Sequence, residues 1–216
     1  MKPCRREAVK IPAAGPVSGD YCDLIRVEDG FYFFLGDVSG KGVAASILMS
    51  QLYALFRTLV AQNPPLDQML ERANRFFCES TLPMHYATLV CGKGDAQGHA
   101  EICNAGHPPL LLLRSGRAVE ALSSNLPVGA FCEARFRTDR IRLEPGDAVL
   151  AYTDGLTEAK DPGGAEYGRQ RLKTLGSGLH GKDPQGIVAA CLDDLERFAG
   201  GTRPADDLTV LALRRR

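Results

Sequence analysis

A predicted β-hairpin at residues 20–37, "DYCDLIRVEDGFYFFLGD", is the feature that most constrains the fold of this chain. Two runs rich in β-branched and aromatic residues flank Asp29-Gly30, a dipeptide typical of tight hairpin turns. A turn centred there offsets Asp20 from Asp37 by two residues, so that Asp20 faces Ser39. Paired strands lie about 4.8 Å apart. Both carboxylates are therefore expected near the same open end of the hairpin.

Helical and strand-like patterns alternate in blocks along the rest of the chain. Leucines recur at helical spacing from Gly42 until Asn63-Pro64-Pro65, and a second helix is expected over residues 66–80. Further strands are expected in "HYATLVCGKGDAQGHAEICNAGHPPLLLLR", "FRTDRIRLEPGDAVLAYTDG" and "DLTVLALR", and further helices around residues 166–175 and 184–199. The strands are not separated by helices one by one, as a parallel sheet requires. We therefore expect antiparallel sheets with helices packed outside them.

The bulk properties exclude several classes of protein. With 216 residues, the chain has room for one domain, residues 1–216, with a sizeable core. Its formal net charge of zero gives no electrostatic footprint for nucleic acid or an anionic membrane. The amino terminus lacks the apolar core of a signal peptide, and no apolar run is expected to reach the ~18 residues that span a bilayer. These features favour a cytoplasmic protein.

The distribution of cysteines also favours a cytoplasmic protein. The seven cysteines are scattered singly with no C-x-x-C pair. This pattern argues against a zinc site and against a disulfide framework. A reducing compartment is the simplest interpretation.

The stretch "FLGDVSGKGVAAS", residues 34–46, invites comparison with a phosphate-binding P-loop. The pattern G-x-x-x-x-G-K-[ST] is met at Gly40 and Lys41 but fails at Leu35 and Gly42. Asp37 lies inside the loop, where its charge would repel a phosphate. A nucleotide-binding domain is therefore kept only as a minor alternative, and an explanation that requires the carboxylate is preferred.

Four aspartates share a position at the start or end of a predicted strand: Asp20, Asp37, Asp154 and Asp206. Any one of them alone would be interpreted as a turn residue, since Asp is depleted from strand interiors. Asp95, Asp147 and Asp161 are interpreted in that way. The hairpin, however, independently brings two of the four together. Clustered carboxylates are costly without cations, so the four are interpreted as metal ligands.

Oxygen-only ligation suits a hard cation such as Mg²⁺ or Mn²⁺. Two such ions about 3.5–4 Å apart can polarise a phosphoryl oxygen and activate a bridging water. On this interpretation residues 34–46 form an acidic metal loop, whose glycines let a backbone carbonyl approach an ion.

Six motifs, in order, resemble those of SpoIIE/RsbU-type bacterial serine phosphatases of the metal-dependent protein phosphatase (PPM) family. They are "GDYCDLI", "GDVSGKGVAASILM", "NAGHPPLLLLR", "LPVGAF", "PGDAVLAYTDGLTEAKDPGGAEYG" and "ADDLTVLAL". The resemblance covers residues 8 to 213. It implies an α+β fold, an α-β-β-α sandwich of two antiparallel sheets flanked by helices, with a site for two Mn²⁺ or Mg²⁺ ions.

The resemblance also implies roles for single residues. It makes Asp37 the bridging metal ligand and gives the Val38 backbone carbonyl to one ion. It assigns Asp154 and Asp206 to the other ion, with Asp20 acting through metal-bound water. The implied reaction is attack of a water bridging the two ions on phosphoserine or phosphothreonine, without a phosphoenzyme.

Three departures from the wider PPM pattern limit this transfer. Ser39 stands where eukaryotic members have a histidine, and no arginine precedes Asp20 in "PAAGPVSGD". His107 stands where some members have an aspartate for a third metal ion, and it is interpreted as a structural residue. Asp207, where eukaryotic members commonly have asparagine, is treated as secondary.

The resemblance further implies a phosphorylated regulatory protein as partner, a STAS-domain anti-anti-sigma factor, and no nucleic acid or membrane. A homodimer is left open, as is whether the chain stands alone or is the catalytic part of a longer sensor protein. The alternative from another class is a pseudo-phosphatase, which binds a phosphoprotein without turnover.

Overall fold

The structure is a computed structural model that describes residues 5–11, 18–40, 42–81, 85–121, 124–202 and 205–215. Lys41, the lysine of the P-loop comparison, lies outside these residues. The chain divides into two compact units. One comprises Val17–His107 and Leu122–Arg142, and the other Met1–Pro16, Pro108–Ala121 and Leu143–Arg216. Each unit is described by itself.

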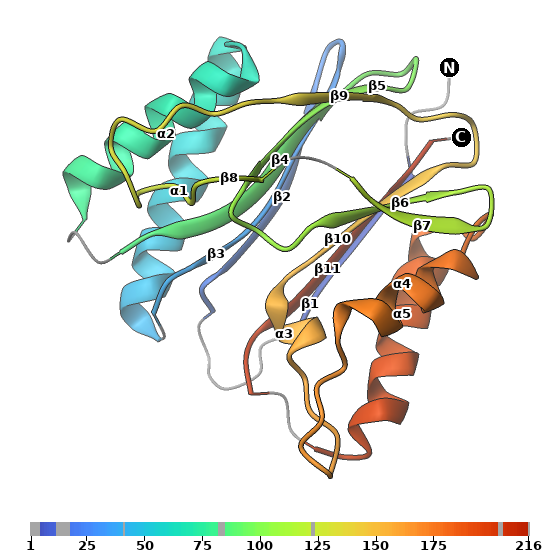
Figure 1. The fold of residues 1–216 in the computed structure, drawn as a ribbon. Helices are drawn as coiled ribbons and strands as arrows, with labels where there is room; N and C mark the ends of the chain where they lie inside the picture. The colour runs from blue at the N-terminus through green and yellow to red at the C-terminus, as the bar shows by residue number, and fades with distance from the viewer. Residues whose placement is uncertain are drawn as a thin grey trace. The chain divides into compact units, whose positions relative to one another are not determined.

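The first unit is built on a sheet with the strand order β2-β3-β4-β5-β8, and β9 also pairs with β5. The strands are β2 (Asp20–Val27), β3 (Gly30–Val38), β4 (Ala87–Gly94), β5 (His99–Ala105), β8 (Ser124–Asn125) and β9 (Asp139–Arg142). All of these pairings are antiparallel except the short pairing of β5 with β8. Helices α1 (Val43–Gln62) and α2 (Leu66–Ser80) pack against this sheet, as Figure 1 shows.

Helix α1 is long and apolar enough to cross a membrane, judged by length and composition alone. The expectation that no apolar run reaches this length was therefore wrong. Its buried residues recur at helical spacing: Ala45, Leu48, Leu52, Phe56, Leu59 and Val60. This face packs into the core of the first unit, where the Phe56 ring lies 4.7 Å from the Phe34 ring between centroids. Burial against the sheet accounts for the apolar character of this face.

Two polar contacts fix α1 on the sheet. Arg57 forms a two-pronged ion pair with Asp23 of β2, with nitrogen–oxygen distances of 2.8 and 2.9 Å. At the C-terminal end of α1, Asn63 ends the helix in a left-handed conformation, at a φ of 48°. Its side-chain oxygen accepts hydrogen bonds from Tyr32 of β3 (2.6 Å) and Lys93 of β4 (2.7 Å). The expected helix stop at residue 63 is thus also an anchor to two strands.

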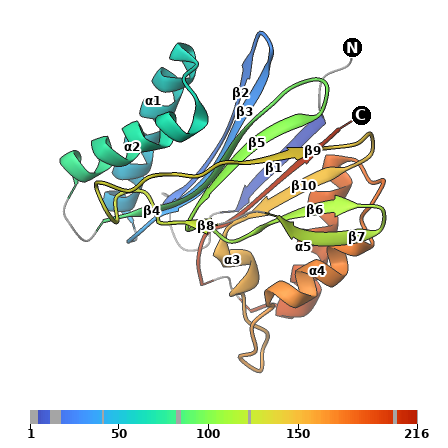
Figure 2. The same cartoon turned by 45° about the horizontal axis from the view of Figure 1, so that its top comes forward.

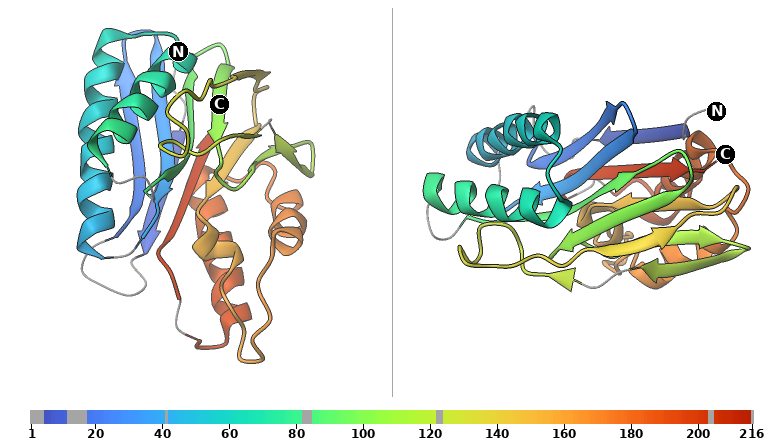
Figure 3. Two further views of the ribbon diagram at one scale, coloured as in Figure 1. Left: turned by 60° about the vertical axis from the view of Figure 1, so that its left-hand side comes forward. Right: turned by 90° about the horizontal axis from the view of Figure 1, so that it is seen from above.

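The second unit is built on a sheet with the strand order β1-β11-β10-β6-β7, in which all pairings are antiparallel. The strands are β1 (Arg5–Ile11), β6 (Leu110–Arg114), β7 (Arg117–Ala121), β10 (Ala148–Tyr152) and β11 (Leu208–Arg214). The helices are α3 (Asp154–Thr157), α4 (Arg169–Ser177) and α5 (Pro184–Ala199). Helices α4 and α5 pack against this sheet, as Figures 2 and 3 show.

Helix α5 begins where the sequence predicts, and Asp183 accepts a hydrogen bond from the Gly186 amide as its N-cap. Helix α4 begins three residues later than the expected residue 166. The reason is local, because Glu166 pairs with Lys160 in a β-bridge and Gly168 turns the chain at a φ of 76°.

The hairpin of β2 and β3 forms as predicted, but its register differs by two residues. Its turn is Glu28-Asp29, and Gly30 is the first residue of β3. A Cβ atom at residue 30 would lie 2.1 Å from the Gly94 carbonyl oxygen of β4. Glycine is therefore required inside the sheet, not in the turn, and this shift places Asp20 directly opposite Asp37.

The cysteine prediction was wrong at one place. Cys78 of α2 and Cys132 form a disulfide, with Cα atoms 5.7 Å apart. Among the other described cysteines, Cys22, Cys91, Cys103 and Cys191 are free thiols, as expected. Two cysteines separated by 54 residues carry no local signal of pairing.

The Asn63 anchor can be tested by two substitutions. Asn63→Ala removes both the acceptor oxygen and a side chain that tolerates the left-handed backbone, whereas Asn63→Gly removes only the acceptor. We expect Asn63→Ala to be less stable than Asn63→Gly by about 1 kcal/mol, or roughly 2–4 °C in Tm. Equal melting temperatures of the two variants would show that backbone strain at residue 63 is unimportant.

Candidate metal-dependent active site

Asp20 and Asp37 form a cross-strand pair at one end of the first unit's sheet. The β2–β3 register sets them directly opposite one another. Asp20 is 2% exposed and Asp37 is half-buried. Two like charges directly opposite on neighbouring strands destabilise a sheet. The arrangement therefore favours a function for the pair over two ordinary turn residues.

Gly19 opens a small space beside this pair. A Cβ atom at residue 19 would lie 3.0 Å from Asp37 Oδ1 and 3.3 Å from the Val38 carbonyl oxygen. Asp37 Oδ1 and the Val38 carbonyl oxygen, which are expected to bind one ion, thus both lie next to the space that a side chain at residue 19 would fill. No sequence signal distinguished Gly19 from the other glycines, although it is the first residue of the motif "GDYCDLI".

Serine side chains hold the segment that carries Gly19. Ser18 Oγ accepts a hydrogen bond from the Asp20 amide at 3.1 Å. Ser46, in the first turns of α1, donates its hydroxyl to the Ser18 carbonyl oxygen at 3.1 Å. The start of α1 therefore positions the backbone around Asp20. Neither serine carried a sequence signal, because the contact joins segments 28 residues apart.

Two residues that depart from the PPM pattern have structural contacts. Ser39 donates its amide to the Tyr86 carbonyl oxygen at 2.8 Å, and its hydroxyl oxygen accepts the Tyr86 amide at 2.9 Å. His107 is buried, and its Nδ1 lies 3.0 Å from Thr88 Oγ1. Its backbone amide donates to Asn104 Oδ1 at 2.8 Å. These contacts fit the structural interpretation of His107 and make Ser39 a clamp on the start of β4.

The other two acids lie in the second unit. Asp154 is the first residue of α3, after β10 has ended at Tyr152, and Asp206 precedes β11. Gly155 brings the two segments into contact, since a Cβ atom there would lie 2.0 Å from the Asp207 carbonyl oxygen and 3.5 Å from that of Asp206. The expectation that the strand runs on to Asp154-Gly155 was wrong, because the chain turns into α3 there.

Thr153 fixes the junction between these segments. Its amide donates to the Thr209 carbonyl oxygen at 3.0 Å, and its hydroxyl oxygen accepts the Thr209 amide at 2.9 Å. Both threonines are fully buried. The backbone that carries Asp154 is therefore tied to the backbone that follows Asp206.

The pKa of Glu158 is affected by neighbouring acids of this unit. Its pKa is raised, first by partial burial and then by the negative charges of Asp154, Glu166 and Asp206. A carboxylate surrounded by acids is disfavoured in its charged form, and a nearby cation would reverse that effect. This second pair thus also lies in surroundings that favour a cation.

The three acids interpreted as turn residues accept hydrogen bonds from nearby backbone amides. Asp95 accepts the His99 amide at 2.9 Å, and Asp147 accepts the Glu144 amide at 2.8 Å. Asp161 Oδ1 accepts two backbone amides, those of Gly163 and Ala165. Their carboxylates satisfy the backbone of their own turns, which confirms the prediction for all three.

The oxygen donors of the first unit are of the type that Mg²⁺ or Mn²⁺ prefers. Asp37 Oδ1 and the Val38 carbonyl oxygen both lie beside the space at Gly19. Over the part of the chain that the structure describes, no group of three or more His, Cys, Asp or Glu side chains is placed to hold a metal ion. The four acids lie as two pairs, one pair in each unit.

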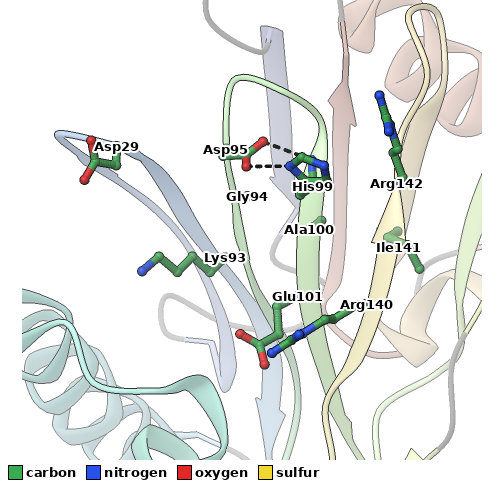
Figure 4. A pocket seen from close by; sticks show the side chains of 10 residues that line it. All are labelled: Asp29, Lys93, Gly94, Asp95, His99, Ala100, Glu101, Arg140, Ile141 and Arg142. Carbon is green, nitrogen blue, oxygen red and sulfur yellow. Dashed lines mark hydrogen bonds and ion pairs between the residues drawn. The ribbon is translucent and has the colours of Figure 1, made fainter.

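A pocket of about 600 Å³ lies elsewhere in the first unit (Figure 4). Its lining includes Asp29, in the turn at the opposite end of β3 from Asp37. Charges of both signs line it, and Asp95 pairs with His99 at 2.9 Å. None of the four candidate acids lines this pocket, so it is not the candidate active site.

Comparison with known proteins gives one consistent result. The family model described as "Stage II sporulation protein E (SpoIIE)" matches residues 28–216. The chain is 29% identical to Protein IcfG of Synechocystis sp., over 94% of this chain and 36% of that protein. It is 24% identical to the phosphoserine phosphatase RsbU of Bacillus subtilis, over 97% of this chain and 62% of RsbU.

Solved structures of bacterial phosphatase domains are also similar to this chain. The RsbU and RsbW domains of Rv1364c from Mycobacterium tuberculosis match with a TM-score of 0.83 and 30% identity, over 99% of this chain and 60% of that chain. The PP2C phosphatase domain of SpoIIE from Bacillus subtilis matches with a TM-score of 0.84 and 24% identity, over 99% of this chain and 64% of that chain. The chain spans about a third and three fifths, respectively, of the curated relatives IcfG and RsbU. The two-sheet α+β fold is therefore that of PPM phosphatases, as predicted.

The space beside Gly19 gives a direct test of metal binding there. Gly19→Ala places a methyl group 3.0 Å from Asp37 Oδ1, so we expect the rise in Tm on adding Mn²⁺ to shrink markedly. The Tm in chelator should change little, because the end of the Asp37 side chain can move. Gly178→Ala is the control, since its Cβ would make only an ordinary contact. An unchanged Mn²⁺ response in Gly19→Ala would remove this space from the metal site.

Gly155 gives a corresponding test in the second unit. Gly155→Ala forces a Cβ against the Asp207 carbonyl oxygen, so the two acid-bearing segments must separate. We expect a loss of stability of about 1–3 kcal/mol, or roughly 2–10 °C in Tm, in chelator as well as in Mn²⁺. Gly178→Ala again serves as control in the same melting experiment. A melting temperature equal to that of the control would contradict this close approach.

Proposed function

Because the chain belongs to the SpoIIE family of PPM-type phosphatase domains, we propose that it is a metal-dependent protein serine/threonine phosphatase. Its substrate is phosphoserine or phosphothreonine on a regulatory protein. The observation that carries the proposal is the pair of carboxylates, Asp20 and Asp37, directly opposite at the end of β2 and β3 and bordered by the Gly19 space.

We assign the acids of both units to one site, so that residues 1–216 act as a single phosphatase domain. Asp37 and the Val38 carbonyl would hold one ion, and Asp37 would also face the second. Asp154 and Asp206 would hold the second ion, and Asp20 would contribute to the same site. When bound, two Mn²⁺ or Mg²⁺ ions supply a water of lowered pKa and polarise the phosphoryl group.

The chain's own contribution is to hold the backbone that carries these acids in place before any ion arrives. Asp20 and Asp37 are fixed by strand pairing, and Asp154 by the Thr153–Thr209 contacts. Groups held in this way need little reorganisation on binding, which favours both affinity and catalysis. Ser39 exchanges two hydrogen bonds with the Tyr86 backbone, which supports a structural role for this residue.

For the partner, we propose a phosphorylated STAS-domain anti-anti-sigma factor in the cytoplasm, without nucleic acid or membrane. The supporting observations are the similarity to RsbU, named as a phosphoserine phosphatase, and to a protein that carries RsbU and RsbW domains. The chain's net charge of zero agrees with a partner that is neither nucleic acid nor an anionic membrane.

The reaction is tested by hydrolysis of p-nitrophenyl phosphate and of phosphoserine proteins, with Mn²⁺ or with chelator. We expect activity only with metal, and a loss of roughly 100-fold or more in kcat for Asp37→Asn, because a ligand carboxylate is removed. Asp161→Asn is the matched control, since asparagine keeps the oxygen that accepts the two turn amides.

Two outcomes would contradict the proposal. Full activity after exhaustive chelation would exclude the metal mechanism. Tight binding of a phosphoprotein with no turnover in any metal would identify a pseudo-phosphatase instead.

The partner assignment makes a separate prediction. A phosphoserine on a folded STAS-type protein should be hydrolysed with a kcat/KM at least about 10-fold above that of the same sequence as a free peptide, because the folded partner adds surface contacts. The measurement is steady-state kinetics on the two substrates in Mn²⁺. Identical values would count against recognition of a folded partner.

A further inference from the structure

The disulfide partners Cys78 and Cys132 lie in a contact that other residues hold together independently. Asn74, fully buried in α2, donates its side-chain amide to the carbonyl oxygens of Phe131 (2.9 Å) and Cys132 (3.1 Å). Its Oδ1 accepts the Gly129 amide at 2.8 Å. The segment 129–132 is thus anchored on α2 whether or not the two sulfur atoms are bonded.

If the disulfide is reduced, the Cys78 thiol also has a hydrogen-bond acceptor nearby. Cys78 Sγ lies 3.6 Å from the Gly129 carbonyl oxygen, within reach of a thiol hydrogen bond. Cys132 is exposed and Cys78 is half-buried, so a small thiol or disulfide in solution can reach Cys132 first. Both redox states therefore fit the same backbone.

The other described thiols are poorly suited to this chemistry. Cys91, Cys103 and Cys191 are buried. Burial raises the pKa of Cys103 and of Cys191 to about 12, so little of either is thiolate at neutral pH. Cys22 is half-buried and is the natural control.

A short backbone path leads from the cysteine pair to the candidate metal loop. Val128 and Ala87, the first residue of β4, exchange two hydrogen bonds of 2.9 and 2.8 Å. Ala87 pairs with Val38 across β3 and β4, and the neighbouring Tyr86 is bonded twice to Ser39. The start of β4 is thus held between the segment that carries Cys132 and the loop that carries Val38.

We propose that Cys78 and Cys132 form a reversible, redox-responsive cross-link that reinforces the docking of residues 126–134 on α2 and stiffens the start of β4 beside Val38 and Ser39. In the forward step, the Cys132 thiolate attacks one sulfur of a small-molecule disulfide such as oxidised glutathione and releases one glutathione thiolate. The Cys78 thiolate then attacks the Cys132 sulfur and releases the second. Two electrons pass from the two cysteines to the oxidant, and their two protons pass to the released glutathione thiolates or to water.

The test uses the full chain in buffers of oxidised or reduced glutathione, with Cys78→Ser, Cys132→Ser and Cys22→Ser alongside. By intact mass, wild type and Cys22→Ser should lose two hydrogen atoms on oxidation and regain them on reduction, whereas the other two variants should not. The oxidised wild type should melt roughly 5–15 °C above its reduced form, because the bond closes a long loop of the unfolded chain. Hydrogen exchange at residues 126–134 and at the Ser39 amide should slow in parallel.

Three results would overturn the inference: no intramolecular bond between these two cysteines, a bond that reduced glutathione cannot open, or exchange at Ser39 that is the same in both states. None of these measurements uses catalysis. The inference therefore stands or falls separately from the proposed phosphatase activity.

Discussion

The like charges of Asp20 and Asp37, set directly opposite on neighbouring strands, are the constraint on which the rest of the structure depends. Such a pair opposes the strand pairing that creates it. It is tolerated because the β2–β3 pairing continues for six further residue pairs beyond it and its neighbour, and because α1 covers these strands. A bound cation would turn this local cost into a gain in stability, since ligands that bind only the folded state stabilise it. In this account, the stability of the sheet maintains an arrangement that the metal requires.

In the second unit, too, the backbone structure holds two acid-bearing segments in place, but the elements that do so are different. There the acids are placed by a strand that ends in a short helix, and Gly155 lets the two segments touch. The pKa of Glu158 is raised first by partial burial and then by the negative charges of Asp154, Glu166 and Asp206. In both units a glycine without a Cβ makes room beside the acid, at Gly19 and at Gly155. The sequence had suggested such a close approach only for the glycines of residues 34–46.

The sequence was sufficient for features that depend on local periodicity or turn chemistry. It predicted the β2–β3 hairpin, helices α1, α2 and α5, and the turn roles of Asp95, Asp147 and Asp161. It failed where tertiary neighbours decide. The hairpin register depends on the approach of Gly30 to Gly94, and the Cys78–Cys132 bond on the docking of a distant segment on α2. Helix α3, with four residues, is too short to show a period.

For the candidate site, the sequence proposed four acids by residue type and by their place at strand ends. It did not identify the residues that hold them, such as Ser18, Ser46 and Thr153, because their contacts join segments distant in the chain. The resemblance to the PPM family supplied the ligand roles, and the backbone geometry of each unit supplied reasons why two acids of each pair lie together.

The central claim is that one acid pair from each unit contributes to a single site for two ions. The most direct measurement is calorimetric titration of Mn²⁺ into metal-free wild type, Asp37→Asn and Asp154→Asn, with Asp161→Asn as control. The account predicts two ions per chain in wild type and in the control, and loss of at least one tight ion in each of the other two variants. A titration of Asp154→Asn that matches wild type in stoichiometry and affinity would contradict it, because the second unit would then hold no part of the metal site.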